Sequence, residues 1–176
     1  MKKAADVHLK SMVFHLCQRG DMKLELFSKD LLQTEEIAKA FAAILKPGNV
    51  VGFSGDLGAG KTTFIKEIAA YFGIDKDEVT STSFVLAREY EGTVPFLHAD
   101  VYRLDCLEEI PVEVSEFIDS QRGIVFLEWV ENVELTTDYL ISLRQERLGE
   151  RLIEIQGPRE FVAELESSVE RFILKL

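Results

Sequence analysis

The sequence predicts an α/β protein in which a mixed β-sheet carries helices on both faces. Two observations support this fold class. The short apolar runs 50–53 and 124–127 are typical of strands that are covered on both sides. Segments with apolar residues at helical spacing lie between such runs. The chain has 176 residues and no repeat, low-complexity tract or linker-like segment, so we place no internal boundary in one domain of ordinary size.

The first half of the chain alternates strands and helices. Residues 22–27 alternate between apolar and polar and predict a strand. We expect Thr34 to be the N-cap of the helix that follows and Pro47-Gly48 to end that helix. The run 50–53 predicts a buried strand, and apolar residues at helical spacing predict a helix over 62–72 directly after a glycine-rich turn.

The second half adds more strands. Residues 84–90 and 94–102 have a β pattern and predict two strands joined by a turn. The acidic segment 107–120 predicts a helix that Pro111 interrupts or restarts. The remaining expected elements are a buried strand at 124–129, a hairpin of 139–143 with 151–155, and a C-terminal helix with its apolar face at Phe161, Leu165, Val169, Phe172 and Ile173.

The region before Met22 does not fit this pattern. We expect residues 1–21 to be an N-terminal extension to a single domain at 22–176, and an upstream start and a disordered extension both stay open for it. Polar residues interrupt its apolar positions and no small-residue cleavage site follows, which argues against a signal peptide. No stretch approaches the roughly 20 apolar residues that cross a bilayer. The two cysteines lack metal-ligand spacing, so we expect a reduced, cytoplasmic setting and no membrane partner.

Acidic residues clearly outnumber basic ones. The sequence holds 31 Asp plus Glu against 20 Lys plus Arg, a formal net charge of −11. Nucleic-acid affinity comes largely from Lys and Arg that displace counterions from phosphates. Autonomous binding of DNA or RNA is therefore disfavoured, and so is binding to an anionic membrane.

The most specific motif is GDLGAGKT at 55–62, which fits G-x-x-x-x-G-K-[ST] between a buried strand and a helix. In such a P-loop the glycines let successive backbone N–H groups point at phosphate oxygens, next to the positive end of the helix dipole. We expect Lys61 to reach the β- and γ-phosphates and the Thr62 hydroxyl to bind Mg²⁺, which makes the fold P-loop NTPase-like. The predicted nucleotide-binding residues are Gly55, Asp56, Leu57, Gly58, Ala59, Gly60, Lys61, Thr62 and Thr63.

Two carboxylates follow predicted strands. Asp100 lies at the end of one strand and Glu128 at the end of another, where an ionised side chain needs a partner. Ligands of such sheets gather beyond the carboxyl ends of the strands. We therefore predict Lys61, Asp100 and Glu128 as catalytic residues, and Thr62, Glu128 and Asp100 as metal-binding residues, Asp100 directly or through water.

Three further features have two interpretations each. Ser81 and Ser83 belong to a polar run that is either a γ-phosphate-sensing switch or an ordinary capped turn. Trp129 either anchors the core or an interface, or helps to order the site. His98 is expected to pack or hydrogen-bond locally rather than to catalyse.

Other nucleotide-binding classes fit less well. No Asn-Lys-x-Asp motif is present, which argues against a Ras-like GTPase. A P-loop kinase for a small metabolite would bring several arginines over the transferred phosphate, whereas only Arg88, Arg103 and Arg122 lie between 63 and 123. That kinase remains the enzymatic alternative. A nucleotide-gated interaction module with incidental hydrolysis is the non-enzymatic one.

Four segments together carry a family resemblance. They are 54–64 (SGDLGAGKTTF), 79–86 (VTSTSFVL), 98–104 (HADVYRL) and 127–131 (LEWVE). In this order and approximate spacing they resemble the TsaE (YjeE) family of bacterial P-loop ATPases, which act in making threonylcarbamoyladenosine in tRNA.

The resemblance implies a function that the residues alone do not. It implies ATP and Mg²⁺ as cofactors, hydrolysis through Asp100 and Glu128, and a switch at Ser81 and Ser83. It also implies two protein partners, TsaD and TsaB, which modify adenosine 37 of tRNA. The ATPase would reset their complex between turnovers and meet tRNA only through it.

The resemblance also adds three weaker nucleotide contacts, at Leu31, Thr34 and Arg151. The chain departs from the family at two points. It has Ser81-Thr82-Ser83-Phe84 where the family has Ser-Pro-Thr-Phe, which loosens the backbone of the switch, and Val130 where the family favours proline.

Overall fold

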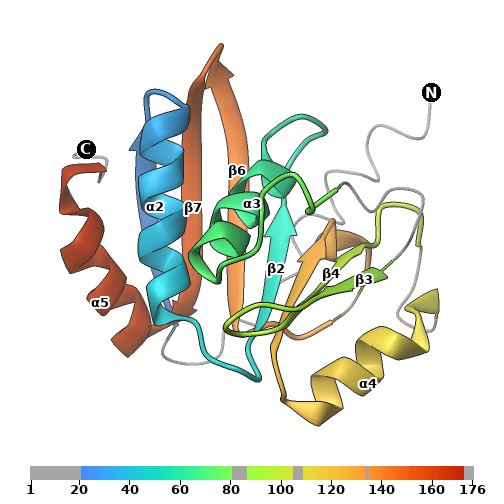
Figure 1. Cartoon of the computed structure of the whole chain (residues 1–176). Helices are drawn as coiled ribbons and strands as arrows, with labels where there is room; N and C mark the ends of the chain where they lie inside the picture. The colour runs from blue at the N-terminus through green and yellow to red at the C-terminus, as the bar shows by residue number, and fades with distance from the viewer. Residues whose placement is uncertain (1–20, 81–86, 105–108, 134, 173–176) are drawn as a thin grey trace, which may run out of the picture.

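The computed structural model describes residues 21–80, 87–104, 109–133 and 135–172, and these form one mixed seven-stranded sheet with helices (Figure 1). The strand order is β1-β7-β6-β2-β5-β4-β3. The strands are β1 (Asp21–Ser28), β2 (Val50–Ser54), β3 (Ala87–Tyr90), β4 (Phe96–Asp100), β5 (Ile124–Glu128), β6 (Tyr139–Arg147) and β7 (Glu150–Pro158). The helices are α2 (Leu31–Ile44), α3 (Lys61–Tyr71), α4 (Val112–Ser120) and α5 (Arg159–Val169), with 3₁₀ turns η2 (Val130–Asn132) and η3 (Glu170–Phe172).

The centre of the sheet is parallel and its margins are antiparallel. Strand β2 pairs in parallel with β5 and β6, and β4 pairs in parallel with β5. Antiparallel pairing adds β3 next to β4 and joins β6, β7 and β1. The carboxyl ends of β2, β4 and β5 consequently lie at one edge of the sheet (Figure 1).

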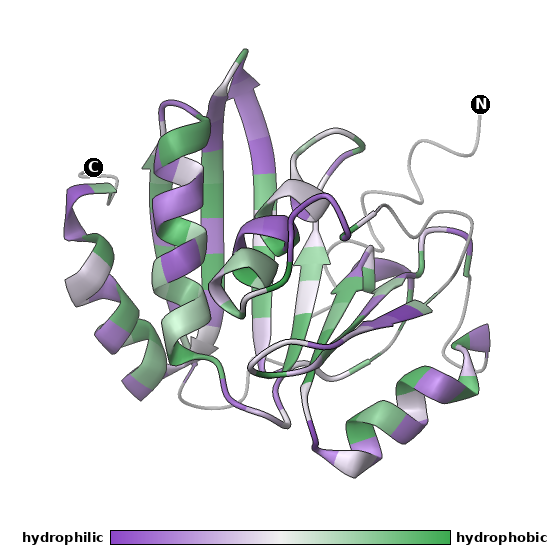
Figure 2. Ribbon diagram, viewed as in Figure 1, coloured by the Kyte–Doolittle hydropathy of each residue, from purple (hydrophilic) through white to green (hydrophobic). Residues whose placement is uncertain are grey.

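Helices cover both faces of this sheet, as the sequence predicts. Helices α2, α3 and α5 pack on one face, where Phe53 of β2 and Phe126 of β5 belong to the larger hydrophobic cluster. Helix α4 covers the other face, where it packs on Leu127 of β5 in a second cluster. Strand β5 alternates between the two clusters, which is why its sequence is apolar throughout. Figure 2 shows α5 striped by hydrophilic and hydrophobic residues, as expected of a helix with one buried face.

The expected start of the first helix is wrong. Asp30, not Thr34, is the N-cap of α2, and its side chain accepts a hydrogen bond from the Gln33 backbone N–H at 2.9 Å. Thr34 lies inside the helix, fully buried, with its hydroxyl within hydrogen-bond distance of Ser28 Oγ (2.8 Å) and Asp30 O (3.1 Å). Asp and Thr are both good N-cap residues. Because the turn after β1 is short, the helix begins early and Asp30 takes the N-cap position.

Most other expected elements are confirmed within a few residues. Helix α4 begins directly after Pro111, which occupies its N-cap position. The β6–β7 hairpin is longer than expected, because pairing continues through the polar segment 144–147, where alternation gives no signal. Residues 1–20, the predicted strand start at 84–86, Ser81, Ser83 and Ile173 lie outside the described residues. Within the described ranges, no helix is both long and apolar enough to span a bilayer.

The aromatic centre of the larger cluster makes a direct test of this packing. Phe126 is fully buried, and its ring centroid lies 5.1 Å from that of Phe96 and 6.1 Å from that of Phe53. We predict that Phe126→Ala lowers the free energy of unfolding by about 3–5 kcal/mol through lost burial and a cavity. Chemical denaturation measures this change. Leu148→Ala, at a side chain 96% exposed, serves as the control and should change it by about 0.5 kcal/mol or less.

Candidate functional site

A glycine-rich loop joins β2 to α3 at the edge where the parallel strands end. Gly55 has φ +125°, and a Cβ on it would lie 2.1 Å from the backbone oxygen of Leu143. Gly60 has φ +105° and is the N-cap of α3. A side chain at either position would be strained by the backbone, and at Gly55 it would also collide with a strand. The loop conformation therefore depends on the glycines of the motif, and it places the N-terminus of α3 at the edge of the sheet.

Lys61 is the first residue of α3, and its ammonium group turns back over the loop. Its Nζ donates hydrogen bonds to the backbone oxygens of Gly55 (2.6 Å) and Asp56 (3.1 Å). It also lies 3.5 Å from the centroid of the Trp129 ring. Burial lowers the pKa of Lys61, and the nearby carboxylates, of Glu128 first, oppose this effect. The lysine is thus held between the loop, an aromatic face and a group of negative charges.

The next residue, Thr62, contacts one of the predicted carboxylates. Its Oγ1 donates a hydrogen bond of 2.6 Å to Glu128 Oε1. The Nε2 atom of His98 lies 2.9 Å from the same oxygen. His98, which was expected to pack or hydrogen-bond locally rather than to catalyse, is buried and hydrogen-bonded, and its partner is a residue of the site itself.

Asp100 and Glu128 are cross-strand partners in the parallel pair β4–β5. Their residues are only 5% and 4% exposed, respectively. Asp100 Oδ1 accepts a hydrogen bond of 2.9 Å from the backbone N–H of Tyr102. The sheet therefore brings together two carboxylates that lie 28 positions apart in sequence, as the strand-end argument predicts.

Trp129 adopts an unusual backbone conformation for a large side chain. Its φ is +63°, in the left-handed region, and its N–H donates to the backbone oxygen of Phe53 at 2.9 Å. Its ring packs on Tyr102, with centroids 4.8 Å apart, and against Lys61. The ring also packs against the second hydrophobic cluster, so the core interpretation and the site interpretation each have an observed contact. Strain of this kind concentrates at functional positions.

Glu131 is a member of the site that the sequence argument missed. Its Oε1 accepts a hydrogen bond of 3.4 Å from the Gly55 backbone N–H, and its buried Oε2 has no hydrogen-bond partner in the described structure. Burial raises the pKa of the Glu131 carboxyl, and hydrogen bonds to backbone N–H groups oppose the shift. Its position three residues after Glu128, just beyond the strand, was the available signal.

The three weaker nucleotide candidates are placed differently from one another. Arg151 of β7 donates from Nε to Ala59 O at 3.2 Å, so it lies against the loop. It pairs across the sheet with Ser28, which brings the start of α2 to the same edge. Leu31, in the first turn of α2, is 47% exposed and accessible there. Thr34 is fully buried, so it supports the turn before α2 and has no surface for a ligand.

The donor set of the site fits a divalent cation held jointly with a ligand. Among the described residues, no group of three or more His, Cys, Asp or Glu side chains is arranged to hold a metal alone. The oxygens available are the Thr62 hydroxyl and the carboxylates of Glu128 and Asp100, which are typical ligands of Mg²⁺ when substrate phosphates complete the shell. Lys61 has four carboxylates in electrostatic range, those of Glu128, Glu131, Asp100 and Asp56. This excess of negative charge also favours a cation.

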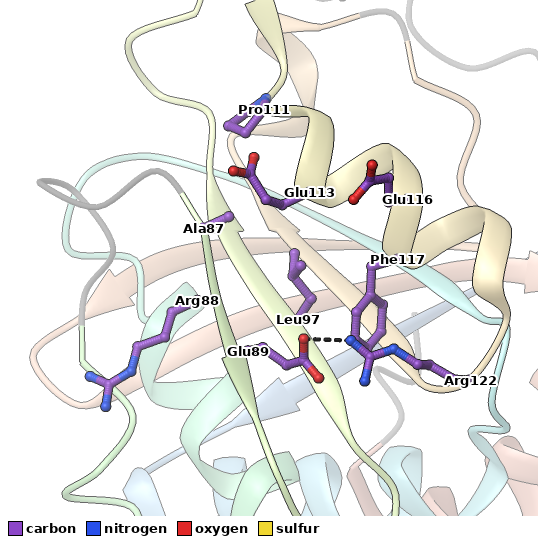
Figure 3. Close-up of a pocket in the computed structure, with 9 residues that line it drawn as sticks. All are labelled: Ala87, Arg88, Glu89, Leu97, Pro111, Glu113, Glu116, Phe117 and Arg122. Atoms are coloured by element: carbon purple, nitrogen blue, oxygen red, sulfur yellow. Dashed lines mark hydrogen bonds and ion pairs between the residues drawn. The ribbon is translucent and has the colours of Figure 1, made fainter.

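A separate pocket lies on the opposite face of the sheet, between β3 and α4 (Figure 3). Phe117 and Leu97 form part of its apolar lining. At its rim Arg122 makes an ion pair with Glu89, and its guanidinium lies 4.5 Å from the centroid of the Phe117 ring. One of the three arginines that a kinase might have used is thus engaged away from the glycine-rich loop.

Comparisons with known proteins agree on one family. The model of the family "Threonylcarbamoyl adenosine biosynthesis protein TsaE" matches residues 28–154. Bacillus subtilis has a relative named tRNA threonylcarbamoyladenosine biosynthesis protein TsaE, which is 41% identical over 117 residues, covering 66% of this chain and 68% of the relative. The protein of the same name from Synechocystis is 35% identical over 118 residues, 65% of this chain and 74% of the relative.

A solved structure extends the agreement to three dimensions. The crystal structure of YdiB from Bacillus subtilis superimposes with a TM-score of 0.64 at 30% identity, covering 86% of this chain and 96% of that one. This confirms the predicted P-loop NTPase-like α/β fold. The matched range 28–154 also contains the loop, both strand-end carboxylates, Glu131 and Arg151. The chain therefore belongs to the TsaE family of threonylcarbamoyl adenosine biosynthesis proteins.

Proposed function

We propose that this chain is a Mg²⁺-dependent ATPase required for the N6-threonylcarbamoyladenosine modification at position 37 of tRNA. In this proposal it resets a complex of TsaB and TsaD between turnovers. The observation that carries it is the junction of Lys61, Thr62 and Glu128 at the end of the glycine-rich loop, with Thr62 Oγ1 and Glu128 Oε1 2.6 Å apart. The names of the relatives support the tRNA part of the proposal.

Each residue has a distinct part in this function. The backbone N–H groups of 55–60 and the N-terminus of α3 bind the phosphates of ATP. Lys61 gives up its hydrogen bonds to the backbone oxygens of Gly55 and Asp56 and donates to phosphate oxygens instead. Its positive charge then offsets the negative charge of the phosphates. Thr62 and Glu128 would hold the cation, and Asp100, oriented by the Tyr102 N–H, would hold it directly or through water.

Glu128 also orients the water that attacks the γ-phosphate. Its buried carboxylate is fixed by hydrogen bonds from α3 and β4, which is the preorganisation that hydrolysis requires. When bound, Mg²⁺ supplies Lewis-acid neutralisation of the charge on the transferred phosphoryl group. In this proposal Arg151, beside the loop, and Leu31, at the start of α2, contact other parts of the nucleotide; the Arg151–Ala59 hydrogen bond and the exposure of Leu31 support this.

The charge of the chain is consistent with indirect contact to tRNA. A net charge of −11 opposes direct binding of a phosphate backbone. The proposed partners TsaB and TsaD hold the RNA in this proposal, and the ATPase acts on their complex. ATP hydrolysis measured with and without purified TsaB and TsaD tests this: we expect turnover to rise when both are present. Unchanged turnover would refute the resetting role.

Replacing the loop lysine tests the phosphate site. We predict that Lys61→Ala lowers kcat/KM for ATP by about 10²–10³-fold, because one preorganised cationic donor is lost. Steady-state phosphate release measures this change. Lys66→Ala, on the same helix α3, is the matched control and should keep the wild-type rate. Full hydrolysis by Lys61→Ala would exclude the assigned phosphate site.

Replacing Glu128 separates hydrolysis from binding. We predict that at saturating Mg²⁺ Glu128→Gln still binds ATP but lowers kcat by about 10²–10⁴-fold, since the amide retains the shape and loses the charge and basicity. With TsaB, TsaD and tRNA present, modification should stop after one turnover per complex. Continued modification through many cycles would instead support a nucleotide-gated interaction module with incidental hydrolysis.

A further inference from the structure

His98 is a fully buried polar residue of β4 that contributes one of the two hydrogen bonds to Glu128 Oε1 and has no chemical step in the proposed function. Its neighbours two positions away on the same face of the strand are Phe96, in the larger hydrophobic cluster, and the site residue Asp100. It therefore sits where the core meets the site. Its Nε2 lies 2.9 Å from Glu128 Oε1 on the neighbouring strand.

The partners of the imidazole define its hydrogen positions. Glu128 Oε1 is a carboxylate oxygen that accepts, so Nε2 of His98 is the donor. The other ring nitrogen, Nδ1, is buried and has no hydrogen-bond partner among the described residues. A hydrogen on Nδ1 would bury a donor without an acceptor, which is costly. The geometry therefore makes Nε2 the nitrogen through which His98 donates to Glu128.

Two donors from two different elements converge on this one oxygen. Thr62 approaches from α3 and His98 from β4, and neither of these two hydrogen bonds uses Oε2. A glutamate side chain has several rotatable bonds, and two directional bonds to one oxygen restrict them. Under the proposed function Thr62 shares its oxygen with the cation. The proposal gives His98 no contact with the cation. Its hydrogen bond to Glu128 is therefore the one that stays the same when the cation binds.

We propose that His98 is a positioning residue that holds the Glu128 carboxylate in the orientation in which it meets the cation and the attacking water. This inference rests on the proposed function of the site. His98 touches neither nucleotide nor cation and acts only through Glu128. Hydrogen-bond partners of this kind typically change metal affinity or activity by about 10–100-fold when they are removed.

Three variants separate positioning from packing. His98→Leu removes the donor and keeps an apolar side chain. His98→Gln returns an amide N–H to the place of Nε2, because both nitrogens are the same number of bonds from Cα. Phe96→Leu is the matched control, at a fully buried position on the same strand and face whose cross-strand partner is Ile124. For each variant we would measure kcat and KM for ATP, the Mg²⁺ concentration that half-saturates ATP binding, and thermal unfolding.

The expected results differ for each variant. His98→Leu should lower kcat and raise the half-saturating Mg²⁺ concentration, each by about 10–100-fold, with KM for ATP nearly unchanged. His98→Gln should restore both quantities to within about threefold of wild type. Phe96→Leu should lower the unfolding temperature without the change in Mg²⁺ dependence. The inference would be overturned if His98→Leu and His98→Gln lost kcat and Mg²⁺ affinity equally, in proportion to a lower unfolding temperature. It would also be overturned if His98→Leu behaved like the wild type.

A spectroscopic measurement tests the hydrogen bond without nucleotide or metal. In ¹⁵N–¹H spectra of the ligand-free protein, we expect the His98 imidazole to carry its hydrogen on Nε2, with a resonance that shifts in Glu128→Gln. An Nε2 without a hydrogen, or no response to Glu128→Gln, would overturn the proposed contact. The two failures are distinguishable: a wild-type protein that neither binds nor hydrolyses Mg-ATP refutes the proposed function itself, whereas an active wild type with an indifferent His98→Leu refutes only the inference.

Discussion

A single carboxylate oxygen, Glu128 Oε1, connects helix α3, which follows the glycine-rich loop, to the parallel strands of the sheet. Thr62 reaches it from the first turn of α3, and His98 reaches it from β4. Glu128 itself ends β5, whose alternating side chains enter both hydrophobic clusters. The position of this oxygen therefore follows from the register of the sheet. A shift of β5 by one residue would turn Glu128 to the α4 face and take it away from Thr62.

Local charge, rather than net charge, explains how an acidic chain would take a triphosphate. Lys61 is surrounded by carboxylates of the site, and its own ammonium group is bound by loop oxygens. This arrangement offers a bare triphosphate one cation among several anions. Under the proposed function a divalent cation would reverse that balance, because it would convert Glu128 and its neighbours from repelling groups into ligands. The net charge of −11 instead opposes direct binding of RNA, which the partner proteins would bind under the proposed function.

Local sequence signals predicted the fold and much of the site, while long-range contacts escaped them. The motif at 55–62 sits between a strand and a helix, and Asp100 and Glu128 end neighbouring parallel strands, as predicted. Asp30 could not be ranked above Thr34 as a cap, because both residue types suit that position. Glu131 was missed because its hydrogen bond to the Gly55 N–H depends on the left-handed backbone conformation at Trp129. A tryptophan in the sequence does not predict that conformation. The shared use of Glu128 Oε1 by His98 and Thr62 depends on side-chain geometry that no spacing encodes.

The affinity of the chain for ATP in the presence and absence of Mg²⁺ tests the central claim most directly. Isothermal titration calorimetry of the full chain with ATP, in excess Mg²⁺ and again in excess EDTA, measures both dissociation constants. The account predicts binding at least about tenfold tighter with Mg²⁺, equivalent to about 1.4 kcal/mol or more. Equal affinity under the two conditions would contradict it, because the carboxylates around Lys61 would then have no part in holding a cation.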